Sequence, residues 1–232
     1  MATCMMDSEC RDAVMCINPC GSNQTCVFIC LSSYADAKFD AFMKCAVTDN
    51  QCVVLTPPDH PVQCRKPTSV FTSFTLADIQ GPWYIVKGKN PIYDCFDCQI
   101  STYTSGSLPY RGSVREQYDA RTVNGSVRRL EVTETVIQRN PMNGGVLNFN
   151  STQDGLDHQE EFRVLDYSQN HGYIFMYYCG GTGAWMYEGA ILYSRTPQLT
   201  PEAMQQVTSS AAAHGYSFGD FCSPRTSDCI SK

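Results

Sequence analysis

A short acidic stretch within a predicted strand carries the clearest candidate for proton-transfer chemistry. In residues 158–164 (HQEEFRV), the two-residue period of a strand places alternate side chains on opposite faces. The face with His158, Glu160 and Phe162 is the more apolar and is predicted to point inward, whereas Glu161 and Arg163 face solvent. Burial would raise the pKa of Glu160 and keep it protonated, as a general acid requires. Two alternatives stay open: a register one residue off, or a Glu160 that hydrogen-bonds a tyrosine for structure alone.

Fourteen cysteines, an even and unusually high number, predict a disulfide framework formed in an oxidising compartment, either secreted or in an organelle lumen. Eight of them fall in an N-terminal segment too small to build an adequate core alone. Cys16/Cys20 and Cys26/Cys30 each lie one helical turn apart, so we expect two short helices bridged by Cys20–Cys26 and Cys16–Cys30. Zinc is the alternative, but these spacings are wider than the usual pairs and the chain has only four histidines, so no metal is expected.

The composition excludes several classes of function. The net charge is −6, with 17 basic residues and no Lys/Arg block, which argues against a nucleic-acid partner. No apolar stretch approaches the length of a membrane span. The first residues lack the apolar core of a signal peptide, so we expect any targeting peptide to be absent from this chain.

From about residue 79 the sequence changes to short β-rich runs separated by Gly- and Asn-containing turns, the pattern of consecutive antiparallel hairpins. In the fourth run, Leu130, Val132 and Val136 alternate with charged and polar residues, which predicts one buried and one solvated face. A helix is predicted to begin at Thr200-Pro201 and to end near Gly215. The eight predicted strands cover residues 82–88, 98–104, 110–118, 127–136, 145–150, 158–165, 172–179 and 186–194.

Hairpins in succession followed by one helix predict a mainly β fold, an eight-stranded antiparallel barrel with a C-terminal flanking helix. We expect a small disulfide-rich helical domain over residues 1–56, with a further helix at 33–43. A proline-marked linker over 57–78 and the barrel over 79–232 follow. The hollow of such a barrel suits one elongated apolar ligand.

Several segments resemble the violaxanthin de-epoxidase family. Gly81-Pro82-Trp83-Tyr84 matches the Gly-x-Trp signature of lipocalins, and residues 90–99 (NPIYDCFDCQ) closely resemble a segment of the plant de-epoxidases. Residues 173–178 (YIFMYY), Ala184-Trp185 and residues 187–195 are similar to the family's last two strands. The N-terminal cysteine spacing is similar to the family's Cys-rich domain, so the resemblance covers nearly the whole chain and implies a lipocalin-type barrel.

The resemblance implies a plastid (chloroplast) enzyme, lumenal or thylakoid-associated, that acts on a carotenoid. Family de-epoxidases use ascorbate to remove the epoxide oxygens of violaxanthin, whereas de-epoxidase-like members of algae rearrange violaxanthin to the allenic neoxanthin without net redox change. A carotenoid is longer than a small barrel is deep, so a homodimer with a shared tunnel is a further expectation. Contact with the thylakoid lipid surface is another.

The same resemblance nominates site residues. Glu160 falls where the de-epoxidases carry their proposed catalytic Asp, and Tyr178 aligns with a tyrosine that the family uses beside that acid. Asp94 and Asp97 match family carboxylates, expected to bind substrate or ascorbate hydroxyls; the alternatives are capping a turn or forming a salt bridge. For each tyrosine the alternative is packing within a strand. The predicted substrate-binding set comprises Asp94, Asp97, Gln99, Phe162, Trp185 and Tyr193.

The chain departs from the family pattern at several positions, and these departures help to choose among three candidate functions. The catalytic Asp has become Glu160, His158 replaces a family tyrosine, and Met186 replaces an aspartate. These changes favour an isomerase that needs no cofactor, in which Glu160 protonates the epoxide and His158 is a candidate base. The alternatives are an ascorbate-dependent de-epoxidase and a non-catalytic xanthophyll-binding lipocalin.

The remaining cysteines are paired with help from the resemblance. The family's matching cysteines imply a bridge between Cys98 and Cys229. Cys95 and Cys179 stand where the plant enzymes have other residues, so we hypothesise an extra bridge between them. Elimination then leaves Cys64 and Cys222 as partners.

Overall fold

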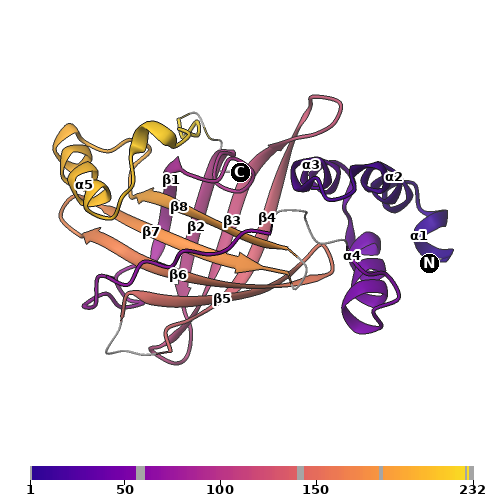
Figure 1. Cartoon of the computed structure of the whole chain (residues 1–232), viewed down its shortest axis with the longest axis horizontal. Coiled ribbons are helices and arrows are strands. Elements are labelled where there is room, and N and C mark those ends of the chain that lie inside the picture. The colour runs from indigo at the N-terminus through magenta and orange to yellow at the C-terminus, as the bar shows by residue number, and fades with distance from the viewer. Residues whose placement is uncertain (1, 56–60, 140–143, 183–184, 228, 230–232) are drawn as a thin grey trace.

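A computed structural model of the chain describes residues 2–55, 61–139, 144–182, 185–227 and 229. Its centre is a closed barrel of eight antiparallel strands in sequence order, as predicted (Figure 1). The expected flanking helix and the disulfide-bridged N-terminal helices are also confirmed. The strands are β1 (Gly81–Gly88), β2 (Asp97–Ser105), β3 (Arg111–Arg121), β4 (Val127–Ile137), β5 (Val146–Gln153), β6 (Leu156–Ser168), β7 (Tyr173–Gly181) and β8 (Met186–Ser194).

One end of the barrel is filled by side chains. Trp83 on β1 is 1% exposed, donates its indole N–H to the Ile79 carbonyl, and lies beneath the Arg195 guanidinium at 3.6 Å. Phe74 and Leu76 pack into the same cluster, although they fall in the segment predicted as a linker. Burying these apolar side chains stabilises the closure, and among the described residues they fill this end of the barrel.

Helix α5 (Pro201–Ala213) covers the outer face of β6 and β7. The Thr200 side chain caps it by accepting a hydrogen bond from Ala203 N, and Pro201 occupies the first turn, as the sequence predicts. Ala203, Val207 and Ala211 form its buried stripe. Every residue of β7 is therefore buried, with one face in the barrel and the other under the helix.

The N-terminal helices are α1 (Ala2–Met6), α2 (Ser8–Ile17), α3 (Gln24–Tyr34) and α4 (Ala37–Met43), followed by a π-helical turn at Lys44–Asp49. The helix predicted over residues 33–43 is wrong in its start, because α3 continues to Tyr34 and a new helix begins at Ala37. Asp36 causes the break, since its carboxylate accepts hydrogen bonds from Lys38 N and Phe39 N and so caps α4. No helix in the described part of the chain is long and apolar enough to cross a membrane.

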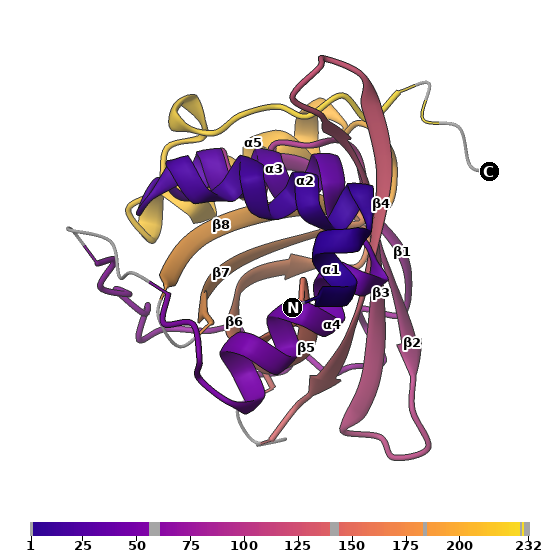
Figure 2. The ribbon, with the colours of Figure 1, turned by 90° about the vertical axis from the view of Figure 1, so that its right-hand side faces the viewer.

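The helical segment lies across the barrel end opposite the filled one (Figure 2). Phe28 of α3 stacks on Phe96 at 5.2 Å between ring centroids. Arg128 of β4 donates to the Ala35 carbonyl, and Thr48 donates to the Gly155 carbonyl at the β5–β6 turn. These contacts make the helices a cover over the barrel mouth.

Six disulfides are present among the described residues. The predicted bridges Cys16–Cys30, Cys20–Cys26 and Cys98–Cys229 are confirmed, and a further bridge joins Cys4 to Cys10. The predicted pairs Cys95–Cys179 and Cys64–Cys222 are wrong. The observed pairs are Cys64–Cys179 and Cys95–Cys222, and Cys45 and Cys52 are free and exposed.

The observed cysteine pairs differ from the predicted ones for a geometric reason. Cys179 points to the outer face of β7, where the segment with Cys64 passes. Cys95 lies beyond β1, whose last residue, Gly88, pairs with Cys222 through backbone hydrogen bonds. Assignment by elimination carries none of this information, because cysteine spacing does not determine connectivity.

Peptide mapping under non-reducing conditions tests these pairings. We expect one linked fragment that joins Cys64 to Cys179 and another that joins Cys95 to Cys222, since both pairs have Cα atoms less than 6 Å apart. A fragment joining Cys95 to Cys179 would contradict the structure.

Candidate functional site

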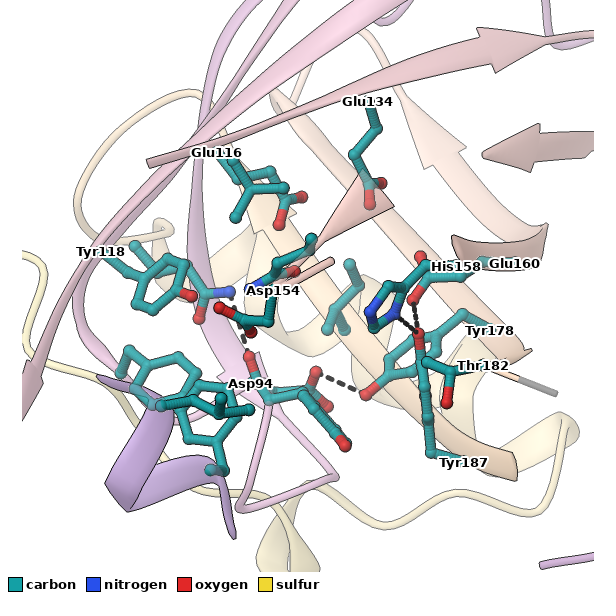
Figure 3. Close-up of a pocket in the computed structure, with 18 of the residues that line it drawn as sticks. Asp94, Glu116, Tyr118, Glu134, Asp154, His158, Glu160, Tyr178, Thr182 and Tyr187 are labelled. Atoms are coloured by element: carbon teal, nitrogen blue, oxygen red, sulfur yellow. Dashed lines mark hydrogen bonds between the residues drawn. The ribbon is translucent and has the colours of Figure 1, made fainter. Parts of the chain in front are cut away.

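A cavity of about 120 Å³ lies inside the barrel beneath α3 (Figure 3). Protein cavities of roughly 150 Å³ hold a molecule the size of benzene, so this space is close to, and slightly below, the volume that one small ring needs. It is shorter than the elongated hollow expected from the sequence, because the cluster around Trp83 fills the far end of the barrel. Five carboxyl side chains line it: Asp94, Glu116, Glu134, Asp154 and Glu160.

Glu160 points into the cavity from β6, on the face that the strand period assigns to it, with Phe162 beside it. Its neighbour Glu161 faces outward and pairs with Arg163 at 2.8 Å. Burial raises the pKa of Glu160 well above its usual value, and the nearby Glu134 carboxyl adds to the effect. Glu160 is thus held in its protonated form, as a proton donor must be.

A hydrogen-bonded chain connects Glu160 to an imidazole. The Tyr187 hydroxyl on β8 donates to Glu160 Oε1 at 2.5 Å, and His158 Nδ1 lies 3.3 Å from that hydroxyl. Burial lowers the pKa of His158, so the neutral ring predominates near neutral pH. In the tautomer whose Nδ1–H is directed to Tyr187, Nε2 has a lone pair that can accept a proton; the ring also hydrogen-bonds the Gln153 backbone carbonyl.

Asp94 and Tyr178 form a second acid–tyrosine pair on the same cavity. The Tyr178 hydroxyl donates to Asp94 Oδ1 at 2.7 Å, and the backbone N–H of Asn90 donates to Oδ2 at 2.8 Å. Burial raises the pKa of Asp94 to about 7, against these hydrogen bonds, which favour the charged form. Asp94 is therefore ionised in a substantial fraction of molecules near neutral pH.

Glycines on neighbouring strands make room for this pair. A methyl group at Gly88 would lie 2.2 Å from Asp94 Cβ, and one at Gly189 would lie 2.4 Å from the Tyr178 hydroxyl oxygen. Both distances are far below van der Waals contact. The two positions thus require glycine for the site to have this shape.

A third group of polar side chains lies on the β2–β4 side of the cavity. Ser101 donates to Glu116 at 3.0 Å, and its hydroxyl is 3.1 Å from that of Tyr193. Burial, together with the charge of Glu134, raises the pKa of Glu116 to about 8. Glu134 accepts a hydrogen bond from Ser151 at 2.8 Å, and burial raises its pKa as well.

The structure brings most of the predicted residues to this cavity. Glu160, His158, Tyr178, Asp94, Gln99, Phe162, Trp185 and Tyr193 all line it. Asp97 does not, because its carboxylate turns outward to Arg225 at 3.4 Å and accepts the Arg225 backbone N–H.

The sequence interpretation missed several lining residues, among them three carboxyl groups and a tyrosine: Glu116, Glu134, Asp154 and Tyr187. A signal existed for two of them. Glu134 is in phase with Val132 and Val136, so the alternation that buries these valines also turns Glu134 inward. Glu116 carries the same signal, because it is in phase with Val114 and Tyr118 on β3. Asp154 and Tyr187 reach the cavity only when the barrel closes.

A family model described as the VDE lipocalin domain matches residues 1–226. The chain belongs to the VDE lipocalin family. This VDE lipocalin protein is 27% identical over 229 residues to a protein named "Violaxanthin de-epoxidase, chloroplastic" from Arabidopsis thaliana, covering 95% of the chain and 49% of that protein. The protein of the same name from Spinacia oleracea is 27% identical over 231 residues, with 95% and 48% covered. The chain thus spans about half the length of these relatives.

Solved structures agree with the fold. Insecticyanin from the tobacco hornworm Manduca sexta aligns with a TM-score of 0.55 at 14% identity, covering 73% of this VDE lipocalin chain and 89% of insecticyanin. The cockroach allergen Per a 4 aligns with a TM-score of 0.55 at 16% identity, covering 73% and 99%. At such identities the likeness establishes the fold alone.

The stability of this VDE lipocalin chain is expected to depend on Asp154. Burial, helped by the charge of Asp40 on α4, raises the pKa of Asp154 from 3.8 to about 7. The folded state thus binds a proton more tightly than the unfolded state, and its stability falls as pH rises from about 4 to 7. Asp154→Asn removes this penalty, and Asn tolerates the local φ of 51°.

We expect Asp154→Asn to increase the free energy of unfolding at pH 8 by on the order of 2 kcal/mol and to leave it unchanged at pH 3. Urea unfolding at the two pH values measures this. The matched control is Asp220→Asn, which removes the same charge at an exposed position. Equal effects of Asp154→Asn at both pH values would contradict the assignment.

Proposed function

We propose that this protein opens an epoxide on the end ring of a xanthophyll by acid catalysis and rearranges it to an allene, without a reductant. The observation that supports this most strongly is the Glu160–Tyr187–His158 chain on a ring-sized cavity. It supplies an acid, a base and a path between them. The substrate class is inferred from the family, whose relatives are named for violaxanthin.

In the first step, Glu160 gives its proton to the epoxide oxygen. The bond between that oxygen and the ring carbon carrying the polyene breaks, and the oxygen stays on the neighbouring ring carbon as a hydroxyl group. The positive charge left on the ring carbon spreads into the polyene. Asp94 faces the same cavity and, when ionised, stabilises this cation electrostatically.

In the second step, His158 Nε2 removes the proton from the first chain carbon, and the electron pair of that C–H bond forms the allene. His158 then passes its Nδ1 proton to Tyr187, which returns its own proton to Glu160, and exchange of the Nε2 proton for one on Nδ1 through solvent restores the starting tautomer. Substrate and product have the same composition, so the cycle needs no external electron donor. This balance distinguishes an isomerase from a de-epoxidase.

The cavity size limits how the pigment binds. One end ring occupies the cavity against Phe162 and Tyr178, and the polyene leaves past Trp185 and α3. The rest of a carotenoid must then lie outside this barrel, against a second copy of the chain in a homodimer or at a thylakoid lipid surface. We place the protein in the plastid, because its relatives are named chloroplastic.

A second candidate function is ascorbate-dependent de-epoxidation. The names of the relatives favour it. In that reaction Glu160 would still protonate the epoxide, but ascorbate would supply two electrons and the oxygen would leave as water. The catalytic acid is common to both functions, so only the products separate them.

Incubation with violaxanthin, with and without ascorbate, separates these functions. We expect a product of unchanged mass, identified by its shortened polyene absorption, in both reactions. Loss of oxygen that occurs only with ascorbate would favour the de-epoxidase and overturn the isomerase. Bound but unchanged pigment would indicate a carrier.

Glu160→Gln tests the acid. The amide keeps the size of the side chain but has no acidic proton to donate to the epoxide, so we expect turnover to fall about 10²- to 10⁴-fold. Glu161→Gln is the matched control, because it makes the same change one residue away on the outer face. Circular dichroism should show both variants folded. Retained activity in Glu160→Gln would refute the assignment.

A further inference from the structure

Two carboxyl groups on the cavity have no part in the proposed reaction. Glu116 projects from β3 and Glu134 from the adjacent β4, where Glu116 is opposite Val132 and Glu134 is opposite Val114. The two acids are therefore diagonal neighbours on the inner face. They lie on the side of the cavity away from Tyr178 and Tyr187 (Figure 3).

The Glu116–Glu134 pair offers both kinds of hydrogen bond. Burial, and next the neighbouring Glu134 carboxyl, raises the pKa of Glu116 to about 8, so the two acids do not both ionise readily. Near neutral pH the pair thus keeps at least one proton. A protonated carboxyl donates one hydrogen bond, and the remaining oxygens accept.

Gln99 adds an observation that does not depend on these acids. Its side chain is 4% exposed and lines the cavity, and its amide nitrogen donates to the Tyr93 carbonyl at 3.1 Å. Its oxygen, Gln99 Oε1, is buried and has no hydrogen-bond partner. On the inner face of β2, Gln99 lies two residues from Ser101, which binds Glu116. A buried acceptor without a donor is unfavourable, and a ligand hydroxyl would satisfy it.

We propose that Glu116, Glu134 and Gln99 form a subsite that binds a hydroxyl group on the end ring of the substrate. The inference rests on the proposed function and deepens it, because it selects hydroxylated epoxide rings over rings that carry only the epoxide. With the epoxide at Glu160, a ring that fills the cavity directs its far edge toward β3 and β4. A hydroxyl there donates to Gln99 Oε1 and accepts from the shared proton of the two acids.

Charge distinguishes this subsite from a cation site. A cation would require both acids to be ionised. In the part of the chain that the structure describes, however, the partners of these acids are hydroxyl groups, Ser101 for Glu116 and Ser151 for Glu134. Their oxygens do not gather with a third ligand in the manner of a metal site. Among the described residues, the one cluster with ligand atoms within 4.8 Å consists of Cys20, Cys26 and Cys30, which are all in disulfides.

The test compares two small ring ligands, β-ionone epoxide and its ring-hydroxylated counterpart. Their binding is followed by tryptophan fluorescence, since Trp185 lines the cavity. The wild-type protein should bind the hydroxylated ring about 100-fold more tightly, as expected when the alternative leaves buried polar groups unpaired. In the double variant Glu116→Met/Glu134→Met, the preference should fall below about threefold while the plain epoxide binds at least as well.

Two further variants make the result specific. Gln99→Met removes the unpaired acceptor and should lower the preference by about tenfold on its own. Glu131→Met, on the outer face of β4, is the matched control and should keep the wild-type preference. A thermal melt verifies that each variant is folded.

The outcomes separate the two proposals. Equal binding of both rings to the wild type, or an unchanged preference in the double variant, overturns the subsite and leaves the proposed function standing. If neither ring binds, the subsite and the proposed function fail together. Ascorbate binding that depends on Glu116 and Glu134, with both rings bound equally, would assign these residues to a reductant and overturn the proposal.

Discussion

The structure depends on the burial of carboxyl groups inside a closed barrel. A carboxylate loses its hydration there, and a second carboxylate nearby makes ionisation still harder. Four of these acids line one cavity, so a charge on one of them disfavours ionisation of another. They are Asp94, Glu116, Glu134 and Glu160. Each is bonded by a hydroxyl group, from Tyr178, Ser101, Ser151 and Tyr187 respectively. Such groups hold the acid in place without supplying a positive charge that would deprotonate it.

The rest of the molecule protects this arrangement. Glycines at 88 and 189 leave space where any side chain would displace an acid or its tyrosine. The cysteine-bridged helices cover the mouth, and α5 packs against the outside of the strands that carry Glu160 and Tyr178. The barrel is thus rigid around groups whose proton affinity depends on small changes in solvation.

Much of the fold and part of the site could be predicted from the sequence. Strand alternation is a local property, so it correctly predicts that Glu160 points inward and Glu161 outward. The turn residues likewise indicate where the hairpins lie. Tyr187 could not be assigned, because its contact with Glu160 joins β8 to β6 across β7. The pairing of Cys64 with Cys179 has the same origin, since residues 115 positions apart meet only after the barrel closes. For Asp97 the structure shows the salt bridge that the sequence left open as an alternative to substrate binding, because the motif could not show that Arg225 lies beside it.

The filled end of the barrel, with Trp83 beneath Arg195, has a consequence for long symmetrical pigments. A rod-shaped molecule can insert one terminus but cannot slide onward until the opposite terminus reaches the same acids. If such a pigment is the substrate, as proposed, a second modification requires it to withdraw, reverse its direction and dock again. Half-converted molecules would therefore escape into the surroundings between visits, and their fate would be decided by competition for a second docking.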